Sequence, residues 1–284
     1  MRSIHGSLGI EGNTLSSEQV TALLHGKKVL GPKREVLEIQ NAIKAYEQIP
    51  HFRPLSAESL KKAHRILMEG LAEDAGQWRS KNVGVFAGSK LAHAAPQAKR
   101  VPELMQQLFV FVKQEKEIHP LIVSCIFHYE LEFIHAFSDG NGRIGRLWQT
   151  VLLRRFHPIF EFTPVESVIK KHQEQYYKSL GQADKCGEST PFVEYSLMTI
   201  VEALRELQAN IRAEPSNSND RLLLAREHFK TDWFSRKDYL NLFKNISTAT
   251  ASRDLALGIR QRIIRKSGDK ATARYQYEST PVSK

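Results

Sequence analysis

Apolar residues recur at helical spacing through most of the first 213 residues. The clearest case follows a glycine-rich loop, where Leu147, Trp148 and Val151 fall on one face of a helix. Residues 121–134 are strongly apolar and contain neither Pro nor Gly, whereas only residues 82–86 have a strand-like pattern. These patterns predict a mainly α domain with helices at 16–25, 33–48, 57–71, 102–115, 121–134, 143–156, 167–183 and 191–212. Gly70 and Gly181 are predicted to end helices.

The pattern changes after residue 213. Residues 214–220 are polar and lack periodicity, which is typical of a linker. Three short helices are then predicted at 222–229, 236–243 and 248–260. Two β-prone arms follow, joined by a turn at Ser267, Gly268 and Asp269. The sequence therefore predicts two domains, 1–213 and 221–284, and the second resembles a winged helix-turn-helix.

Charge is distributed unevenly between these predicted domains. The chain carries +10 at pH 7, and residues 221–284 hold fourteen Lys and Arg against six Asp and Glu. A basic winged helix indicates duplex DNA as a partner, and a protein-docking or merely basic domain is the alternative. The candidate DNA contacts on the recognition helix and wing are Thr248, Thr250, Arg253, Lys266, Lys270 and Arg274.

Composition narrows the class of protein. Hydrophobic residues make up 41% and charged residues 25%, which is typical of a globular protein. No apolar run approaches the roughly 18 residues that span a membrane, and no signal peptide is visible after Arg2. We therefore expect a cytoplasmic protein without a membrane partner. Cys125 and Cys186 are the only cysteines, too few for a disulfide framework.

The densest chemistry lies in the loop 135–146, which reads His-Ala-Phe-Ser-Asp-Gly-Asn-Gly-Arg-Ile-Gly-Arg. The loop opens a predicted helix, so its backbone N–H groups and the helix dipole form an anion site. Gly140 and Gly142 let the backbone approach a phosphate closely. Arg143 and Arg146 are three residues apart and share a helix face beside that site. Such a cluster is suited to a polyphosphate.

This stretch resembles the signature of the Fic family, H-[PA]-F-x-[DE]-G-N-G-R-x-x-R, and departs from its usual form only in having Ala136 for Pro. A second match, from Ser7 to Asn13, resembles the family's inhibitory motif and implies an inhibitory helix at the N-terminus. A third, from Gly76 to Arg79 and on to Val83–Gly88, resembles the family's substrate-docking hairpin, or flap. The resemblance covers roughly residues 5–200.

The resemblance implies a protein adenylyltransferase, which transfers AMP from ATP to a Ser, Thr or Tyr hydroxyl of a protein. His135 would be the general base, and Asp139 would hold Mg²⁺ against the phosphates. Gly142 favours AMP transfer, because the phosphate-transferring branch has Lys there. The implied ATP contacts are Glu11, Val85, Phe86, Ala87, Gly88, Asp139, Gly140, Asn141, Gly142, Arg143, Ile144, Gly145, Arg146, Tyr176 and Asp184, with Tyr177 as a neighbour of the adenosine.

The same resemblance assigns regulation to Glu11. Its carboxylate would pair with Arg146, remove the partner of the γ-phosphate and so inhibit transfer, with Ser7 bracing it. In some relatives this glutamate orients a water that removes AMP, so an AMP-removing enzyme is one alternative. A DNA-binding regulator that uses the Fic core as a nucleotide sensor is another. Modification of the chain itself and a homodimer remain open.

A rival site is also considered. His128, Glu132 and His135 lie at i, i+4 and i+7 of one predicted helix, and two histidines with a carboxylate can bind a transition metal. However, these positions span two helical turns, which is too far for one ion without a bend. A nucleotide site is therefore favoured over this metal site.

Overall fold

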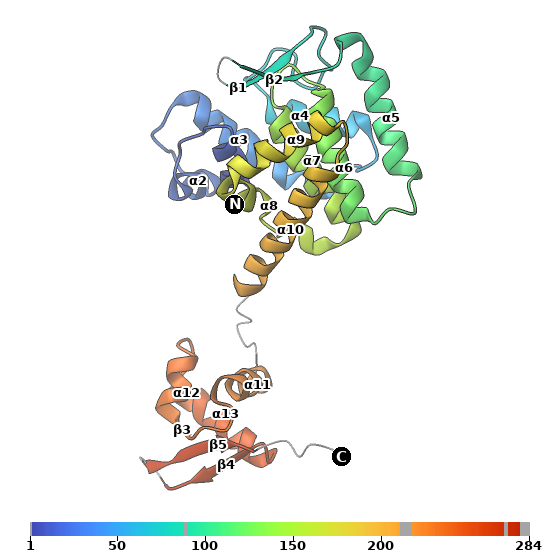
Figure 1. The fold of residues 1–284 in the computed structure, drawn as a ribbon. Helices are drawn as coiled ribbons and strands as arrows, with labels where there is room; N and C mark the ends of the chain where they lie inside the picture. The colour runs from blue at the N-terminus through green and yellow to red at the C-terminus, as the bar shows by residue number, and fades with distance from the viewer. Residues whose placement is uncertain (1, 88–89, 211–216, 270–271, 279–284) are drawn as a thin grey trace. The chain divides into compact units, whose positions relative to one another are not determined.

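The computed structural model describes residues 2–87, 90–210, 217–269 and 272–278. The chain divides into two compact units, Met1–Asn210 and Ile211–Lys284, which are described separately below (Figure 1). Among the described residues, no helix is both long and apolar enough to cross a bilayer.

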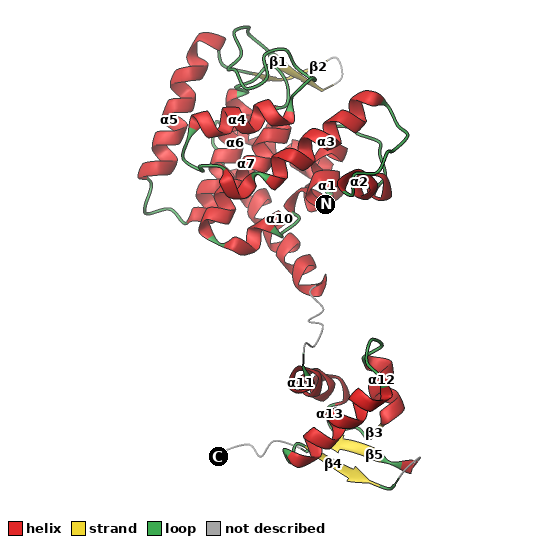
Figure 2. Cartoon of the chain, turned by 180° about the vertical axis from the view of Figure 1, so that it is seen from behind, coloured by secondary structure: helices red, strands yellow, loops and turns green. Residues whose placement is uncertain are grey.

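The first unit is built almost entirely from helices (Figure 2). Its only strands among the described residues are β1 (Gly84–Ala87) and β2 (Lys90–Ala94), an antiparallel hairpin with an irregularity between Val85 and Phe86. Short 3₁₀ turns lie at Ile49–His51, Ala98–Arg100 and Pro158–Glu161. The α-helices are α1 (Arg2–Ile10), α2 (Ser17–Leu24), α3 (Lys33–Glu47), α4 (Ala57–Leu67), α5 (Val101–Gln114), α6 (Pro120–Ile134), α7 (Asn141–Phe156), α8 (Val165–Lys171), α9 (Gln173–Cys186) and α10 (Thr190–Asn210).

Helices α6 and α7 form the centre of this unit and pack against each other (Figure 1). Helix α7 is buried on nearly all sides, as expected for the middle of a large domain. Trp148 and Leu147 are fully buried there, and Phe52 and Phe109 pack around the indole. The buried polar side chains of α7 must therefore form hydrogen bonds inside the protein. Asn141, Arg143 and Arg146 are such residues, and they lie in the first two turns of the helix.

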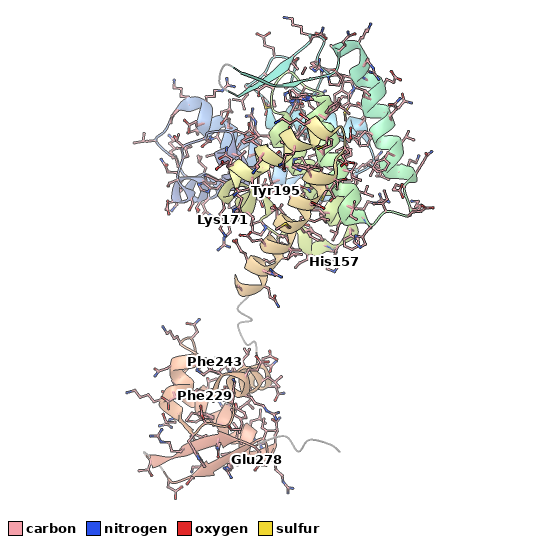
Figure 3. The ribbon with its side chains drawn as sticks, viewed as in Figure 1. His157, Lys171, Tyr195, Phe229, Phe243 and Glu278 are labelled. Carbon is pink, nitrogen blue, oxygen red and sulfur yellow. The ribbon has the colours of Figure 1, made fainter. Side chains whose placement is uncertain are left out.

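The helix predicted at 167–183 is wrong, because the chain breaks at His172 into α8 and α9. Helix α8 packs against α1 and α10, whereas α9 packs mainly against α10, so tertiary packing overrides the continuous periodicity. Two residues labelled in Figure 3 hold the junction: Lys171 pairs with Glu202 of α10 at 2.6 Å, and the Tyr195 hydroxyl donates to the His172 carbonyl. Gly181 does not end a helix either. It lies inside α9, and Gly187, at φ 70°, follows the last turn.

Smaller differences concern helix ends and the N-terminus. Helix α4 ends at Leu67 rather than residue 71, and Gly70 lies beyond it at φ 70°. Helix α1 corresponds to the N-terminal helix that the inhibitory motif implies, although its bounds were not predicted. It forms because Ile4 and Leu8 are buried against the core. Glu11 lies in the turn directly after it.

The described residues of the second unit form three helices and a three-stranded antiparallel sheet. The order along the chain is α11 (Ser218–Phe229), β3 (Phe234–Ser235), α12 (Arg236–Leu242), α13 (Thr248–Arg260), β4 (Ile264–Ser267) and β5 (Arg274–Tyr277). The first strand pairs with the last, giving the spatial order β3-β5-β4. Phe229 and Phe243, labelled in Figure 3, pack in its core.

Two features of this unit differ from the sequence prediction. The predicted linker extends too far, because Asn217 caps α11 with its side chain and the helix begins at Ser218. The short strand β3 is not predicted. It forms because Phe234 is buried beneath the sheet and pairs with Tyr275 of β5.

Candidate active site

The site is built on the turn that joins α6 to α7. His135 caps α6 with a left-handed backbone, φ 50° and ψ 57°, and its N–H donates to the Leu131 carbonyl at 3.0 Å. A non-glycine residue in this region is uncommon and strained, so surrounding contacts must hold it. Gly140, at φ 80°, precedes the first residue of α7. A side chain at position 140 would also lie 2.6 Å from the Met68 sulfur.

Two buried side chains brace this loop. The Asn141 amide accepts from the Phe137 N–H and donates to the Phe137 carbonyl, both at 2.9 Å. His64 of α4 accepts from the Gly76 N–H at Nδ1, so Nε2 carries the proton and donates to the Asp139 carbonyl at 2.9 Å. Burial lowers the pKa of His64 to about 4, which keeps this ring neutral. Asn141 is therefore mainly a brace, and the first-turn backbone N–H groups of α7 remain available for an anion.

The His135 imidazole faces the site with a defined tautomer. Its Nδ1 lies 3.3 Å from the Glu132 carbonyl and donates to it, which leaves Nε2 as an acceptor. Burial lowers the pKa of His135 below its ordinary value of 6.5, although Glu132 opposes this effect. The ring is therefore neutral at pH 7 and able to take a proton.

A cavity of about 450 Å³ opens beside His135. It brings together residues that are far apart in the sequence, from the N-terminal turn, the flap, α6, α7 and α9. Its volume falls in the range of small-molecule sites. The lining residues are Glu11, His93, Tyr129, Glu132, Phe133, His135, Gly142, Arg146, Tyr176, Tyr177, Leu180, Gly181 and Asp184.

Arg146 is held by the N-terminal segment. Its guanidinium donates to the Ser7 hydroxyl and the Ser7 carbonyl, both at 3.1 Å, and to Glu11 Oε1 at 2.5 Å. The Arg146 side chain is 1% exposed. Burial alone would lower the pKa of Arg146, but Glu11 and the neighbouring groups raise it above its ordinary value. The cation is thus fully engaged by the segment around Glu11.

A second charge cluster lies at the other side of the loop. Arg143 donates to Asp139 at 3.0 Å and to Glu38 of α3 at 3.2 Å. Arg34, also on α3, lies 3.6 Å from the second Asp139 oxygen and 3.9 Å from Glu38. The Asp139 side chain remains 47% exposed, so one carboxylate faces solvent next to the first turn of α7.

The other predicted nucleotide contacts fall into different surroundings. Ile144 is fully buried in the hydrophobic core, and Gly145 packs against His128 and Glu132, so neither side-chain position faces the cavity. Tyr176 lines the cavity, and burial raises its pKa well above 10. Val85, Phe86 and Ala87 belong to β1, and Gly88 lies outside the described residues.

Sequence reasoning missed several residues of the cavity wall. His93 of β2 pairs with Asp184 at 2.9 Å, and the Tyr129 hydroxyl donates to the other Asp184 oxygen at 3.1 Å. These contacts join the flap to α6 and α9, and no sequence spacing connects them. Glu132 was named only in the rival metal cluster, although its place three residues before His135 also indicated the nucleotide site.

The rival metal cluster is not assembled. His128 Nδ1 bonds Gln149 at 2.9 Å, and its Nε2 faces Tyr176 at 3.3 Å and Glu132 at 3.7 Å. Within the described ranges, no three His, Cys, Asp or Glu side chains are grouped so as to hold a metal ion.

The candidate DNA contacts lie on α13 and the sheet of the second unit. Thr248, Arg253, Lys266 and Arg274 are exposed, whereas the Thr250 hydroxyl meets Ser247 at the start of α13. Lys266 pairs with Asp269 at 3.1 Å. Lys270 lies outside the described residues.

Comparisons with known proteins agree with this geometry. The sequence model of the Fic/DOC family matches residues 54–153. A Fic family protein of known structure from Desulfovibrio desulfuricans is 38% identical, with a TM-score of 0.70 over 98% of this chain and 86% of that one. The chain belongs to the Fic family. The likeness to that structure extends over both units, because it covers nearly the whole chain.

Curated relatives match about two thirds of this Fic protein. The protein adenylyltransferase Fic of Nematostella vectensis is 29% identical over 203 residues, which is 68% of this chain and 45% of that protein. The enzyme of the same name from Culex quinquefasciatus is 28% identical over 207 residues, 69% of this chain and 39% of that protein. The chain thus spans less than half the length of these relatives.

Proposed function

We propose that this Fic protein is a protein adenylyltransferase that transfers AMP from ATP to a Ser, Thr or Tyr hydroxyl of a protein. His135 Nε2 takes the proton of the hydroxyl, whose oxygen attacks the α-phosphorus. The bond from that phosphorus to the oxygen bridging toward the β-phosphate breaks, and pyrophosphate leaves. The names of the curated relatives support the same reaction class.

One observation carries this proposal. A neutral imidazole with a free Nε2 shares a cavity of about 450 Å³ with Arg146 and Gly142, at the N-terminus of α7. A base beside an anion site is the arrangement that proton removal and phosphate stabilisation require together. Gly142 also favours AMP transfer over phosphate transfer, because no cationic side chain stands at that position.

The residues present fit a magnesium ion that arrives with the nucleotide. Mg²⁺ usually takes one or two protein carboxylates and completes its shell with phosphate oxygens and water. Asp139 offers one half-exposed carboxylate of this kind beside the anion site. We propose that Asp139 holds the ion, which when bound neutralises charge on the phosphates. Arg143, already paired with Asp139, would contact the β- and γ-phosphates.

We further propose that Glu11 inhibits the enzyme in cis. Its carboxylate occupies Arg146, which would otherwise bind the γ-phosphate, and it stands close to Gly142: a Cβ there would lie 2.6 Å from Glu11 Oε1. A bound triphosphate would therefore lack Arg146 as a cationic partner and would be repelled by the negative charge of Glu11. Ser7 supports this arrangement, since its hydroxyl and carbonyl orient the same guanidinium.

A transfer assay with labelled ATP tests the function and its inhibition together. We expect Glu11→Gly to incorporate label into itself or into lysate proteins well above wild type. The double variant Glu11→Gly/His135→Ala is the control and should incorporate none. Equal labelling of wild type and Glu11→Gly would remove the inhibitory role of Glu11. Labelling that survives loss of His135 would remove the proposed mechanism. Mass spectrometry of the labelled lysate then identifies the target and its hydroxyl.

Removal of AMP is a second candidate, favoured by the position of Glu11. Its carboxylate lines the same cavity as His135 and is 31% exposed, so it is able to orient an attacking water. Protein labelled by Glu11→Gly serves as the substrate. Loss of label on adding wild-type protein, and no loss with Glu11→Gly, would favour this activity.

For the second unit we propose a winged helix that binds duplex DNA. The three described helices and the β3-β5-β4 sheet, whose strands β4 and β5 follow α13, support this fold, and the excess of positive charge in residues 221–284 supports an acidic partner. A regulator that only senses nucleotide would bind DNA but transfer no AMP, even as Glu11→Gly. The labelling assay therefore separates it from an enzyme.

A further inference from the structure

Arg79 is a buried cation whose guanidinium bonds backbone carbonyls of the described chain. It lies between the flap and the catalytic loop and is only 3% exposed. Its guanidinium donates to four carbonyl oxygens from three places in the chain, at residues 81, 96 and 134–135. A buried charge must be satisfied by hydrogen bonds, and a guanidinium fixes the direction of each of its donors. The arrangement therefore specifies where these four carbonyls lie.

Two of these bonds hold the backbone that carries His135. Arg79 Nε donates to the His135 carbonyl at 2.7 Å, and Nη2 donates to the Ile134 carbonyl at 3.3 Å. The Arg79 backbone N–H also donates to the Ala136 carbonyl at 3.0 Å. These carbonyls end α6, where the helix dipole favours a cation. They also flank the left-handed His135, so the contacts oppose relaxation of its strained backbone.

The other two bonds hold the base of the flap. Nη1 donates to the Lys81 carbonyl at 2.9 Å, before β1, and Nη2 donates to the Pro96 carbonyl, after β2. Both legs of the hairpin are thus tied to the residue that ties His135. At the far side, His93 of β2 bonds the Phe133 carbonyl at 2.8 Å. The flap is positioned from α6 at two points.

We propose that Arg79 is a positioning residue that sets the backbone of the base His135 and the base of the substrate-docking flap as one unit. This inference rests on the proposed function, in which His135 removes the proton of a hydroxyl docked along the flap. Arg79 does not line the nucleotide cavity, so it acts through the backbone and through its charge.

The charge of Arg79 affects the pKa of His135, which can be measured. A residue with only a structural role would leave that pKa unchanged. Burial lowers the pKa of His135 most, Glu132 raises it, and His93 and Arg79 lower it further. Replacing Arg79 with a neutral residue should therefore raise the pKa of His135. The other ionisable groups that line the cavity with His135 are carboxylates, a guanidinium and phenols: Glu11 after α1, Tyr129 of α6, Arg146 of α7, and Tyr176, Tyr177 and Asp184 of α9.

Two variants separate the effect of the Arg79 charge from the effect of its several hydrogen bonds. Arg79→Gln removes the charge, whereas Arg79→Lys keeps it but cannot reach carbonyls on the helix end and both flap legs together. In NMR titrations of the full chain, with the His135 signal assigned through His135→Ala, we expect Arg79→Gln to raise the His135 pKa above that of the wild type. Arg79→Lys should leave it near wild type. Both variants should speed hydrogen exchange of the β1 and β2 amides.

Steady-state kinetics in the Glu11→Gly background separate an effect on kcat from an effect on KM. Both variants should lower kcat for AMP transfer about tenfold or more, since small misplacement of a base is costly, while KM for ATP stays unchanged. Arg100→Gln, a loss of an exposed arginine after the flap, is the matched control and should change nothing. An unshifted His135 pKa in folded Arg79→Gln would overturn the inference, as would wild-type flap exchange in Arg79→Lys. Should Arg79→Gln not fold, the exchange result of Arg79→Lys decides. The titration and exchange need no AMP transfer, so they stand apart from the proposed function.

Discussion

His135 combines a strained backbone with a shielded imidazole. The left-handed torsions turn its ring toward the cavity, and the Glu132 carbonyl takes the Nδ1 proton. Burial then keeps the pKa of the ring below 6.5. Position, tautomer and protonation state are thus set by three different features: the backbone torsions, the Glu132 carbonyl and burial.

The protonation of His135 gives a pH prediction. Because its pKa is lowered, the neutral form predominates at pH 7 and transfer should lose rate only as the pH falls below 6.5. The acid limb of kcat/KM for the Glu11→Gly enzyme measures this. His135→Ala should abolish transfer while binding ATP nearly as tightly, since the base acts in the chemical step. A rate that already halves above pH 7 would contradict this protonation state.

Asp139 offers a prediction about the metal. Asp139→Asn should weaken ATP binding in the presence of Mg²⁺ and have a smaller effect when Mg²⁺ is chelated, because the carboxylate charge serves the ion. Isothermal calorimetry on the Glu11→Gly background compares the two conditions. Asp74→Asn is a suitable control, since Asp74 bonds Ser138 of the same loop at 2.5 Å. Equal losses with and without Mg²⁺ would assign Asp139 to loop structure.

At the scale of the element, α1 lies against α8 through two glycines. A Cβ at Gly6 would lie 2.7 Å from the backbone of Glu166 and Ser167. A Cβ at Gly9 would meet only the flexible end of Lys170. The close approach at Gly6 therefore determines the distance between α1 and α8. That distance in turn determines the position of Glu11 relative to Arg146.

This difference predicts activation without changing Glu11. Gly6→Ala should push α1 from α8, at a cost of about 1–3 kcal/mol in packing, and raise AMP transfer toward the level of Glu11→Gly. Gly9→Ala is the matched control, because Lys170 can swing away. The labelled-ATP assay compares the three proteins. Equal activity of the two alanine variants would indicate that the seating of α1 does not govern inhibition.

The element scale also explains which parts of the fold were predictable. Helix α13 has the predicted bounds, because its apolar spacing and its Ser247 cap are local signals. The break between α8 and α9 was missed because no Pro or Gly marks His172. There the direction of the chain follows from packing against α1 and α10, which are distant in the sequence.

At the scale of the whole molecule, each unit has its own hydrophobic core. The second core surrounds a buried ion pair: Arg221 donates to both oxygens of Asp254, at 2.6 and 2.9 Å, and Tyr239 contacts the same carboxylate. Burial would raise the pKa of Asp254, but these hydrogen bonds outweigh it and bring the pKa below 3.8. The stability that this group contributes is present above 3.8 and is lost as the pH falls through the lower folded-state pKa.

Removal of this carboxylate should therefore unfold one unit only. Asp254→Ala leaves Arg221 buried without its partner, at a cost of about 3–5 kcal/mol. We expect an earlier melting transition for the second unit in calorimetry, with ATP binding by the first unit retained. Asp232→Ala, a change at an exposed position, is the control. A single shifted transition with loss of ATP binding would contradict the independence of the units.

The proposed DNA contacts give a prediction for the intact chain. Binding to duplex DNA should weaken steeply with salt, because cationic contacts release counterions. Replacing Lys266, Lys270 and Arg274 together should weaken binding to all sequences and flatten that dependence. Arg253→Ala should instead change sequence preference, if the exposed side chain reads a base edge. Fluorescence anisotropy at two salt concentrations measures both effects. Absence of binding at low salt would favour a protein-docking domain.

The sequence by itself determined the helical class, the loop from His135 to Arg146 and the candidate partner of Arg146, because these depend on local spacing and on an ordered motif. Only the tertiary structure decided the rest of the site. Arg79 and His64 lie more than fifty residues before the loop they brace, and His93 meets Asp184 across the cavity. Such contacts depend on how helices pack, and long-range packing leaves no periodic trace along the chain.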